Sequence, residues 1–228
     1  MNLIEHYYLF DGVLSFGVEI VRPENSNMKI LIRNLKSVQL TIILACIPIL
    51  SLGGCSKYSD EVQANLTKLK TTKSCSGCDL SGIELISIDL KNADLSGSNL
   101  TGANLNRVDL TEANLTNANL TDANLASATL IGATLRNTNL TGVKLSYANI
   151  NGVVMSNVML GGAKLNNAKV VNSRISYSDM TGANLYNADL TDTRVSDKTL
   201  KDTVLCKTIM PSGQIENRNC RSAIWQTK

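Results

Sequence analysis

The sequence predicts an all-β fold, a right-handed quadrilateral β-helix with a short N-terminal capping helix. A large aliphatic residue occupies every fifth position from Leu80 to Leu205, and the residue two places before it is usually small. Aromatic residues make up only 4% of the chain, although 43% of its residues are hydrophobic. A core built without aromatic side chains suggests that one small packing unit of aliphatic residues occurs many times, so the composition indicates a repeat protein.

A period of five fits neither a straight helix nor a flat strand, whose periods are 3.6 and 2. It fits a chain that turns a corner every five residues, with the aliphatic and the small residue pointing inward. Four such sides close a coil of twenty residues, and coils stack about 4.8 Å apart. Residues 78–205 then form roughly six and a half coils with a filled interior, and parallel crossovers make the superhelix right-handed.

The N-terminal part has the layout of an export signal. Residues 28–54 combine a basic start with the apolar run Val38 to Leu52 and the small residues Gly53 and Gly54. With the Cys55 that follows, this end resembles the lipobox of bacterial lipoproteins, in which the cysteine is lipidated. A simply cleaved signal, an uncleaved membrane anchor and a buried segment of a soluble protein are the alternatives. Residues 1–27 are either an over-called upstream stretch or a cytoplasmic tail.

Residues 55–77 are expected to be a linker followed by a capping helix. Ser59 is a candidate N-cap, and acidic residues follow it where a helix N-terminus favours them. Val62, Leu66 and Leu69 fall on one apolar stripe. A short amphipathic helix at this place would cover the exposed end of the repeat array.

The pattern A-(D/N)-L-x-x over residues 78–205 resembles the pentapeptide repeat family, and the resemblance implies the right-handed quadrilateral β-helix already expected from the geometry. Residues 73–82 (KSCSGCDLSG) and 205–213 (LCKTIMPSG) are similar to the ends of exported cyanobacterial members. That similarity and the signal-like segment suggest an exported, membrane-associated protein in the cell envelope, the periplasm or a thylakoid lumen.

The cysteines outside the signal-like segment fall at the two ends of the array. In an exported protein, paired cysteines indicate disulfides, so Cys75 with Cys78 and Cys206 with Cys220 are the expected pairs. A redox site and a metal site are the alternatives. Residues 206–228 are expected to form a C-terminal cap and tail.

Catalytic groups are scarce. The only histidine is His6, before the repeats, which excludes Ser-His and Cys-His pairs within them. We therefore expect no enzyme activity and no cofactor. The net charge of +3 argues against a nucleic-acid partner.

The outward positions are least regular around residues 153–175, where Asn and Asp give way to basic and apolar residues. Neutral sequence drift on a surface that tolerates substitution would explain this irregularity. The more specific hypothesis is a binding patch for an unknown protein partner. The runner-up function is DNA mimicry by a topoisomerase-binding pentapeptide protein, which the near-neutral rod and the export signal disfavour. The candidate patch comprises Lys144, Val154, Met159, Lys164, Lys169, Arg174 and Arg194.

Overall fold

The computed structural model describes residues 4–11, 14–21, 29–31 and 57–220. The chain divides into two compact units, Met1–Lys57 and Tyr58–Lys228. Cys55 and most of the signal-like segment lie outside the described residues, so the lipidation of Cys55 stays a prediction. No helix in the described ranges is long and apolar enough to cross a membrane.

The first unit contains a small antiparallel sheet that the sequence analysis did not predict. Its strands are β1 (Ile4–Asp11), β2 (Leu14–Val21) and β3 (Lys29–Leu31), in the order β1-β2-β3. Two of them, β1 and β2, fall within residues 1–27, the stretch expected to be an upstream over-call or a cytoplasmic tail.

The second unit begins with the predicted capping helix, α2 (Asp60–Thr72). The Ser59 side chain accepts a hydrogen bond from the Val62 N–H at 3.3 Å, so it is the N-cap. Lys73 ends the helix in the left-handed conformation with φ 53°. The helix buries the expected apolar stripe, including Leu69, and this confirms the prediction for the segment.

Two polar side chains near α2 bond to the backbone of the first coil. The Asn65 Nδ2 donates to the Asp79 carbonyl at 3.1 Å, and the Tyr58 hydroxyl accepts from the Glu84 N–H at 3.0 Å. Elsewhere in the rod the preceding coil would supply those partners. The N-terminal cap therefore covers the apolar end and also satisfies its backbone groups.

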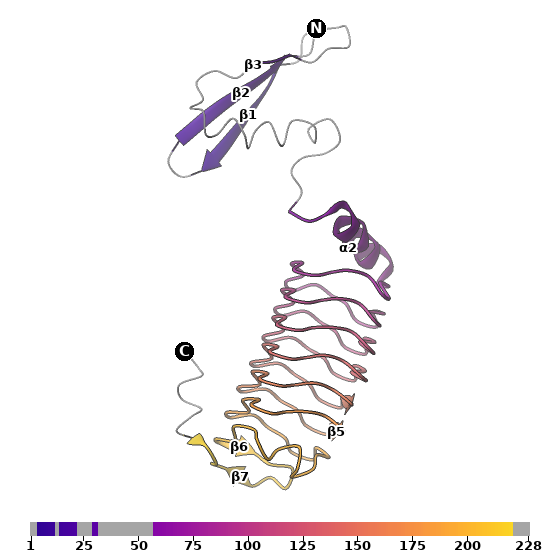
Figure 1. Cartoon of the computed structure of the whole chain (residues 1–228), viewed down its shortest axis with the longest axis vertical. Coiled ribbons are helices and arrows are strands. Elements are labelled where there is room, and N and C mark those ends of the chain that lie inside the picture. Colours follow the sequence, from indigo (N-terminus) through magenta and orange to yellow (C-terminus); the bar gives the residue numbers. More distant parts are fainter. Residues whose placement is uncertain (1–3, 12–13, 22–28, 32–56, 221–228) are drawn as a thin grey trace. The chain divides into compact units, whose positions relative to one another are not determined.

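Four ladders of parallel bridges run along the second unit, and each joins residues twenty positions apart (Figure 1). In one ladder, the Leu80 N–H donates to the Asn99 carbonyl at 2.8 Å, and the Asn99 N–H donates to the Cys78 carbonyl at 2.9 Å. This gives the four-sided coil of twenty residues that the period predicts. The right-handed sense of the β-helix stays a prediction.

One of the parallel pairings is regular enough to form two strands, β4 (Val154–Ser156) and β5 (Arg174–Ser176). They lie one coil apart on the same face of the rod. Figure 1 shows β5 in the C-terminal half of the stack.

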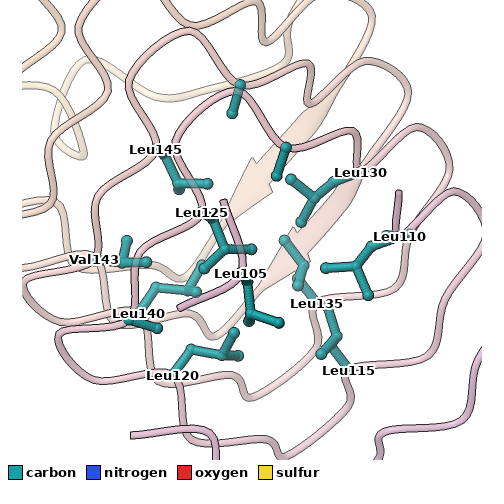
Figure 2. Packing of buried hydrophobic residues seen from close by; sticks show 14 of the residues in the cluster. Leu105, Leu110, Leu115, Leu120, Leu125, Leu130, Leu135, Leu140, Val143 and Leu145 are labelled. Carbon is teal, nitrogen blue, oxygen red and sulfur yellow. The ribbon is translucent and has the colours of Figure 1, made fainter. Parts of the chain in front are cut away.

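The interior is filled by leucines from successive coils, which point toward one another (Figure 2). Leu120, Leu140 and Leu160 are each at most 1% exposed, and so are most of the alanines two residues before a leucine. The predicted inward pair of each repeat is therefore buried, and the core has no lumen.

Corner residues adopt the left-handed conformation in coil after coil. At one corner, Gly142 has a φ of 68°, and a Cβ there would strike the Asp122 carboxylate of the preceding coil. An Asn or Asp before the corner accepts an N–H two residues later, as Asn139 does from Thr141 at 3.0 Å. These side chains have the turn role that the sequence predicts.

The last coil departs from the expected register between residues 196 and 202. Thr199 pairs with no residue of the preceding coil; instead its N–H donates back to the Ser196 carbonyl at 3.0 Å. The repeat resumes at Val204.

The C-terminal cap is an antiparallel pair, β6 (Thr208–Ile209) and β7 (Ile215–Glu216). Ile209 also pairs in parallel with Asp189 of the coil before it. β7 therefore covers a strand edge that the last coil would otherwise leave open.

Candidate partner-binding surface

Outward side chains form four columns along the rod, one per ladder. We name three of them by the residues that interrupt the usual Asn or Asp. The arginine column is Thr134, Val154, Arg174 and Arg194; the lysine column is Asn124, Lys144, Lys164 and Asn184; the methionine column is Asn139, Met159 and Asp179. The fourth column contains Lys169, between Asn149 and Asp189.

The candidate patch is therefore divided over all four faces. Val154, Arg174 and Arg194 share one column, while Lys144 and Lys164 share another and Met159 and Lys169 stand in the remaining two. The structure brings together the members of each column, but it does not form one patch from all seven residues.

The two basic stacks are present as the twenty-residue period predicts. Arg174 pairs in parallel with Arg194, and Lys144 with Lys164. These four side chains are exposed, and none forms a salt bridge with another described residue. By contrast, Lys91 near the N-terminal end lies 3.3 Å from the Asp109 carboxylate.

At the corner that leads into the arginine column, a side-chain hydroxyl replaces the usual backbone hydrogen bond; we call such a corner opened. In a regular corner the small inward residue donates its N–H to a carbonyl three residues back, as Ala148 does to Leu145 at 3.0 Å. At Val153 the N–H donates instead to the Ser173 Oγ of the next coil at 3.1 Å, and that hydroxyl donates to the Ile150 carbonyl at 2.8 Å. The hydroxyl thus stands between the two groups that would otherwise bond.

The same substitution occurs one coil later. The Ser173 N–H donates to the Thr193 Oγ1 at 3.4 Å, and the Thr193 hydroxyl donates to the Val170 carbonyl. Ser173 and Thr193 are both 3% exposed. Two successive corners beside the arginine column therefore differ from the regular turn.

A shallow depression of about 440 Å³ lies at these opened corners. Its polar lining includes Arg174, Arg194, Asp192 and Asn172, and Val154 also lines it. A second depression, of about 660 Å³, lies between β5 and the irregular segment 196–202 and is lined in part by Tyr177. Both are open hollows on the outer surface, in the C-terminal half of the rod.

Charge is unevenly distributed along the rod. Residues 126–178 contain five Lys or Arg and no Asp or Glu, and we call this the acid-free segment. Of the seven large hydrophobic residues that are exposed in the part of the chain that the structure describes, five also fall within it. They are Ile131, Tyr147, Val154, Met159 and Tyr177.

The patch predicted from the sequence omitted the two exposed tyrosines. Tyr147 is 67% exposed and Tyr177 is 87% exposed, and both have positive φ at corner positions. Their signal was present in the sequence, since corner positions otherwise hold Gly, Asn or another small or polar residue. Tyr177 lies at the corner between the arginine and methionine columns, so its exposed ring adds apolar surface between these two columns.

Asp94 and Asp179 accept hydrogen bonds within the turns that follow them. The pKa of Asp94 lies below its ordinary value because Ser96 hydrogen-bonds the carboxylate through its side chain and its backbone. Thr181 lowers the pKa of Asp179 in the same way. A catalytic acid would need a raised pKa, and these two shifts have the opposite sign.

The structure pairs the cysteines as predicted. The S–S distance is 2.06 Å for Cys75 and Cys78 and 2.15 Å for Cys206 and Cys220. Among the described residues no group of three His, Cys, Asp or Glu side chains could hold a metal ion. The oxidised state of both pairs in the protein's own compartment stays a prediction.

Stacked four-sided coils with a filled core define a solenoid built from five-residue units. A model of the pentapeptide repeats, in eight copies, matches residues 78–117, 88–125, 118–157 and 155–192. The chain belongs to the pentapeptide repeat family, as the sequence pattern suggested. A comparison with curated proteins found no match.

Solved structures of pentapeptide repeat proteins resemble the chain. HetL, involved in heterocyst differentiation regulation in the cyanobacterium Nostoc sp. strain PCC 7120, is 31% identical over 63% of this chain and 74% of its own, with a TM-score of 0.32. A pentapeptide repeat protein of the Arabidopsis thaliana thylakoid lumen is 25% identical over 78% of this chain and 99% of its own, with a TM-score of 0.22.

A trypsin-treated form of QnrB1, a plasmid-mediated fluoroquinolone resistance protein, is 21% identical over 67% of this chain and 84% of its own, with a TM-score of 0.43. Because these TM-scores are all below 0.5, family membership rests on the repeat model and on the residues that it matches.

Proposed function

We propose that this protein is a non-enzymatic β-helical scaffold, right-handed and exported, which binds another protein through the outer faces of its rod. The observation that carries the proposal is the contrast between interior and surface. The interior is closed by apolar side chains, whereas large apolar side chains stand exposed on the acid-free segment.

The interior offers no place for a substrate. The leucines and alanines leave no lumen, and the two depressions are open hollows on the outside of the rod. Small-molecule sites are usually concave and bury most of their ligand. A flat face with isolated apolar side chains suits a protein surface better.

The exposed apolar residues suit a partner. Met159 is 48% exposed on the face of the rod, where most coils carry Asn or Asp, and Tyr177 is 87% exposed at a corner. Tyr and Met are enriched at protein interfaces.

Photo-crosslinking tests the proposal. A photoreactive amino acid is placed in turn at exposed outward positions along residues 84–194, and cross-links are scored in living cells. We expect protein cross-links concentrated between residues 131 and 177. An even distribution along the rod, or no protein cross-link at any position, would contradict the proposal.

We further propose that Cys55 carries a lipid that holds the protein at the membrane. The basic start, the apolar run and the Leu52-Gly53-Gly54-Cys55 sequence support this. Labelling with a fatty acid should mark the wild-type protein, and Cys55→Ala should abolish the label and release the protein from the membrane fraction. A wild-type protein that is soluble and unlabelled would exclude the anchor.

DNA mimicry is the less favoured function. A DNA mimic needs acidic side chains along its length, and residues 126–178 provide five basic residues and no acidic one. The interruption lies in the middle of the rod, where a duplex mimic would need continuous negative charge.

A further inference from the structure

We propose that the arginine column, together with the depression beside it, binds an acidic segment of a protein partner. A carboxylate would sit between Arg174 and Arg194, and an apolar side chain of the same segment would pack on Val154. This inference rests on the proposed function, because it names the place and the chemistry of the protein contact.

Two arginines follow each other in the arginine column. Arg174 and Arg194 stand one coil apart, about 4.8 Å at the backbone, and neither is neutralised by a described carboxylate. Like charges opposite each other on neighbouring strands are unfavourable. A carboxylate between them removes the repulsion and accepts the bidentate bonds that the planar guanidinium offers.

A hollow lies beside the two arginines. Ser173 and Thr193 open two successive corners with buried hydroxyls, and the resulting depression is lined by both arginines. The lysine column stacks charge in the same way, but its corners keep the regular turn, since the Val143 N–H donates to the Leu140 carbonyl at 3.2 Å and the Ala163 N–H to the Leu160 carbonyl at 3.0 Å. Of these two basic columns, the arginine column is therefore the one whose corners depart from the regular turn beside a recess.

The residues around the two arginines favour a carboxylate over a run of phosphates. Val154, 37% exposed, stands in the same column one coil before Arg174. Asp192 also lines the depression, so its two arginines and one aspartate give it a net charge of only +1. A nucleic acid or an anionic membrane needs many adjacent basic groups, whereas a short acidic and apolar peptide segment needs only the two arginines and the valine.

Binding of a defined acidic polymer tests the site. The probe is the random copolymer of glutamate and tyrosine, titrated against the full chain at low and at physiological salt. The variant R174N/R194N restores the Asn that is usual in these columns, so the fold should be kept, and it should weaken binding about tenfold, because two exposed charge pairs are lost.

The matched control is K144N/K164N, which removes the same charge from the other stack. Binding should change less than about twofold, the size of a weak surface effect. Equal losses in the two variants would show a response to net charge alone and would overturn the site. Tighter binding of duplex DNA or of anionic vesicles than of the copolymer would also overturn it, in favour of the other partner class.

Cross-linking separates this inference from the proposed function. A photoreactive residue at position 154 should capture a partner through a peptide rich in Asp and Glu, and one at position 164 should capture none. Capture only at position 164, or at position 159, would refute the arginine site and leave the protein-binding function standing. Absence of any protein cross-link on the rod would remove both.

Discussion

Replacing Leu140 with Ala tests the five-residue register from inside the rod. Leu140 is 1% exposed and lies one coil from Leu120 and one from Leu160, so no neighbour can move in without breaking its own ladder. The change removes three buried carbon groups, about 2.4 kcal/mol of transfer free energy. The cavity adds to this, and the expected loss of stability is about 3–5 kcal/mol.

Denaturation by guanidinium, followed by far-ultraviolet circular dichroism, measures this loss as a lower midpoint. Lys144→Ala in the same coil is the control, because Lys144 is exposed and makes no ion pair with a described residue. Its expected effect is within about 0.5 kcal/mol. Equal effects at the two positions would refute the assignment of inward and outward residues on which the binding surface depends.

Three further predictions concern the corner, the C-terminal cap and pH. Ser173→Ala should cost about 1–2 kcal/mol, because the Val153 N–H loses its acceptor; unchanged thermal stability would show instead that the corner closes into the regular turn. Replacing Cys206 and Cys220 with Ser should cost about 3 kcal/mol by loop entropy, and two free thiols in wild-type protein from its own compartment would contradict the bond. Because the pKa of Asp94 is lowered in the folded protein, the stabilisation from this carboxylate is present above the ordinary carboxyl pKa and is lost as the pH falls through the folded-state pKa. At pH values below about 4, the melting temperature of the wild type should therefore decrease, and it should decrease less in Asp94→Asn.

The five-residue period predicted the four-sided coil of twenty residues in the second unit. One inward aliphatic residue in every five fixes which side chains are buried, and the twenty-residue coil then fixes which outward residues stack. The pairings of Lys144 with Lys164 and of Arg174 with Arg194 followed from that count and are present. The capping helix followed in the same way from Ser59 and its apolar stripe.

Closeness in the sequence did not show which residues of the candidate patch lie on the same face of the rod. Residues twenty apart share a column, but residues five apart lie on different faces, so a cluster in sequence such as Val154, Met159 and Lys164 is spread around the rod. The departure at residues 196–202 was hidden for a related reason. Leu200 and Leu205 keep the aliphatic spacing, and both are buried although the backbone between them leaves the regular path.

The opened corners show how a repeat acquires a local site without losing its core. Ser173 replaces an alanine of nearly the same size, so the inward column stays packed and the residue is 3% exposed. Its hydroxyl nevertheless accepts a hydrogen bond from the Val153 N–H and donates one to the Ile150 carbonyl, the two backbone groups of the corner in the preceding coil. Because the ladder holds every other residue in place, the change remains local, and the recess appears beside the two arginines. A hydroxyl at the inward position in two successive coils, next to a break in the outward Asn column, is thus the sequence feature that marks this surface.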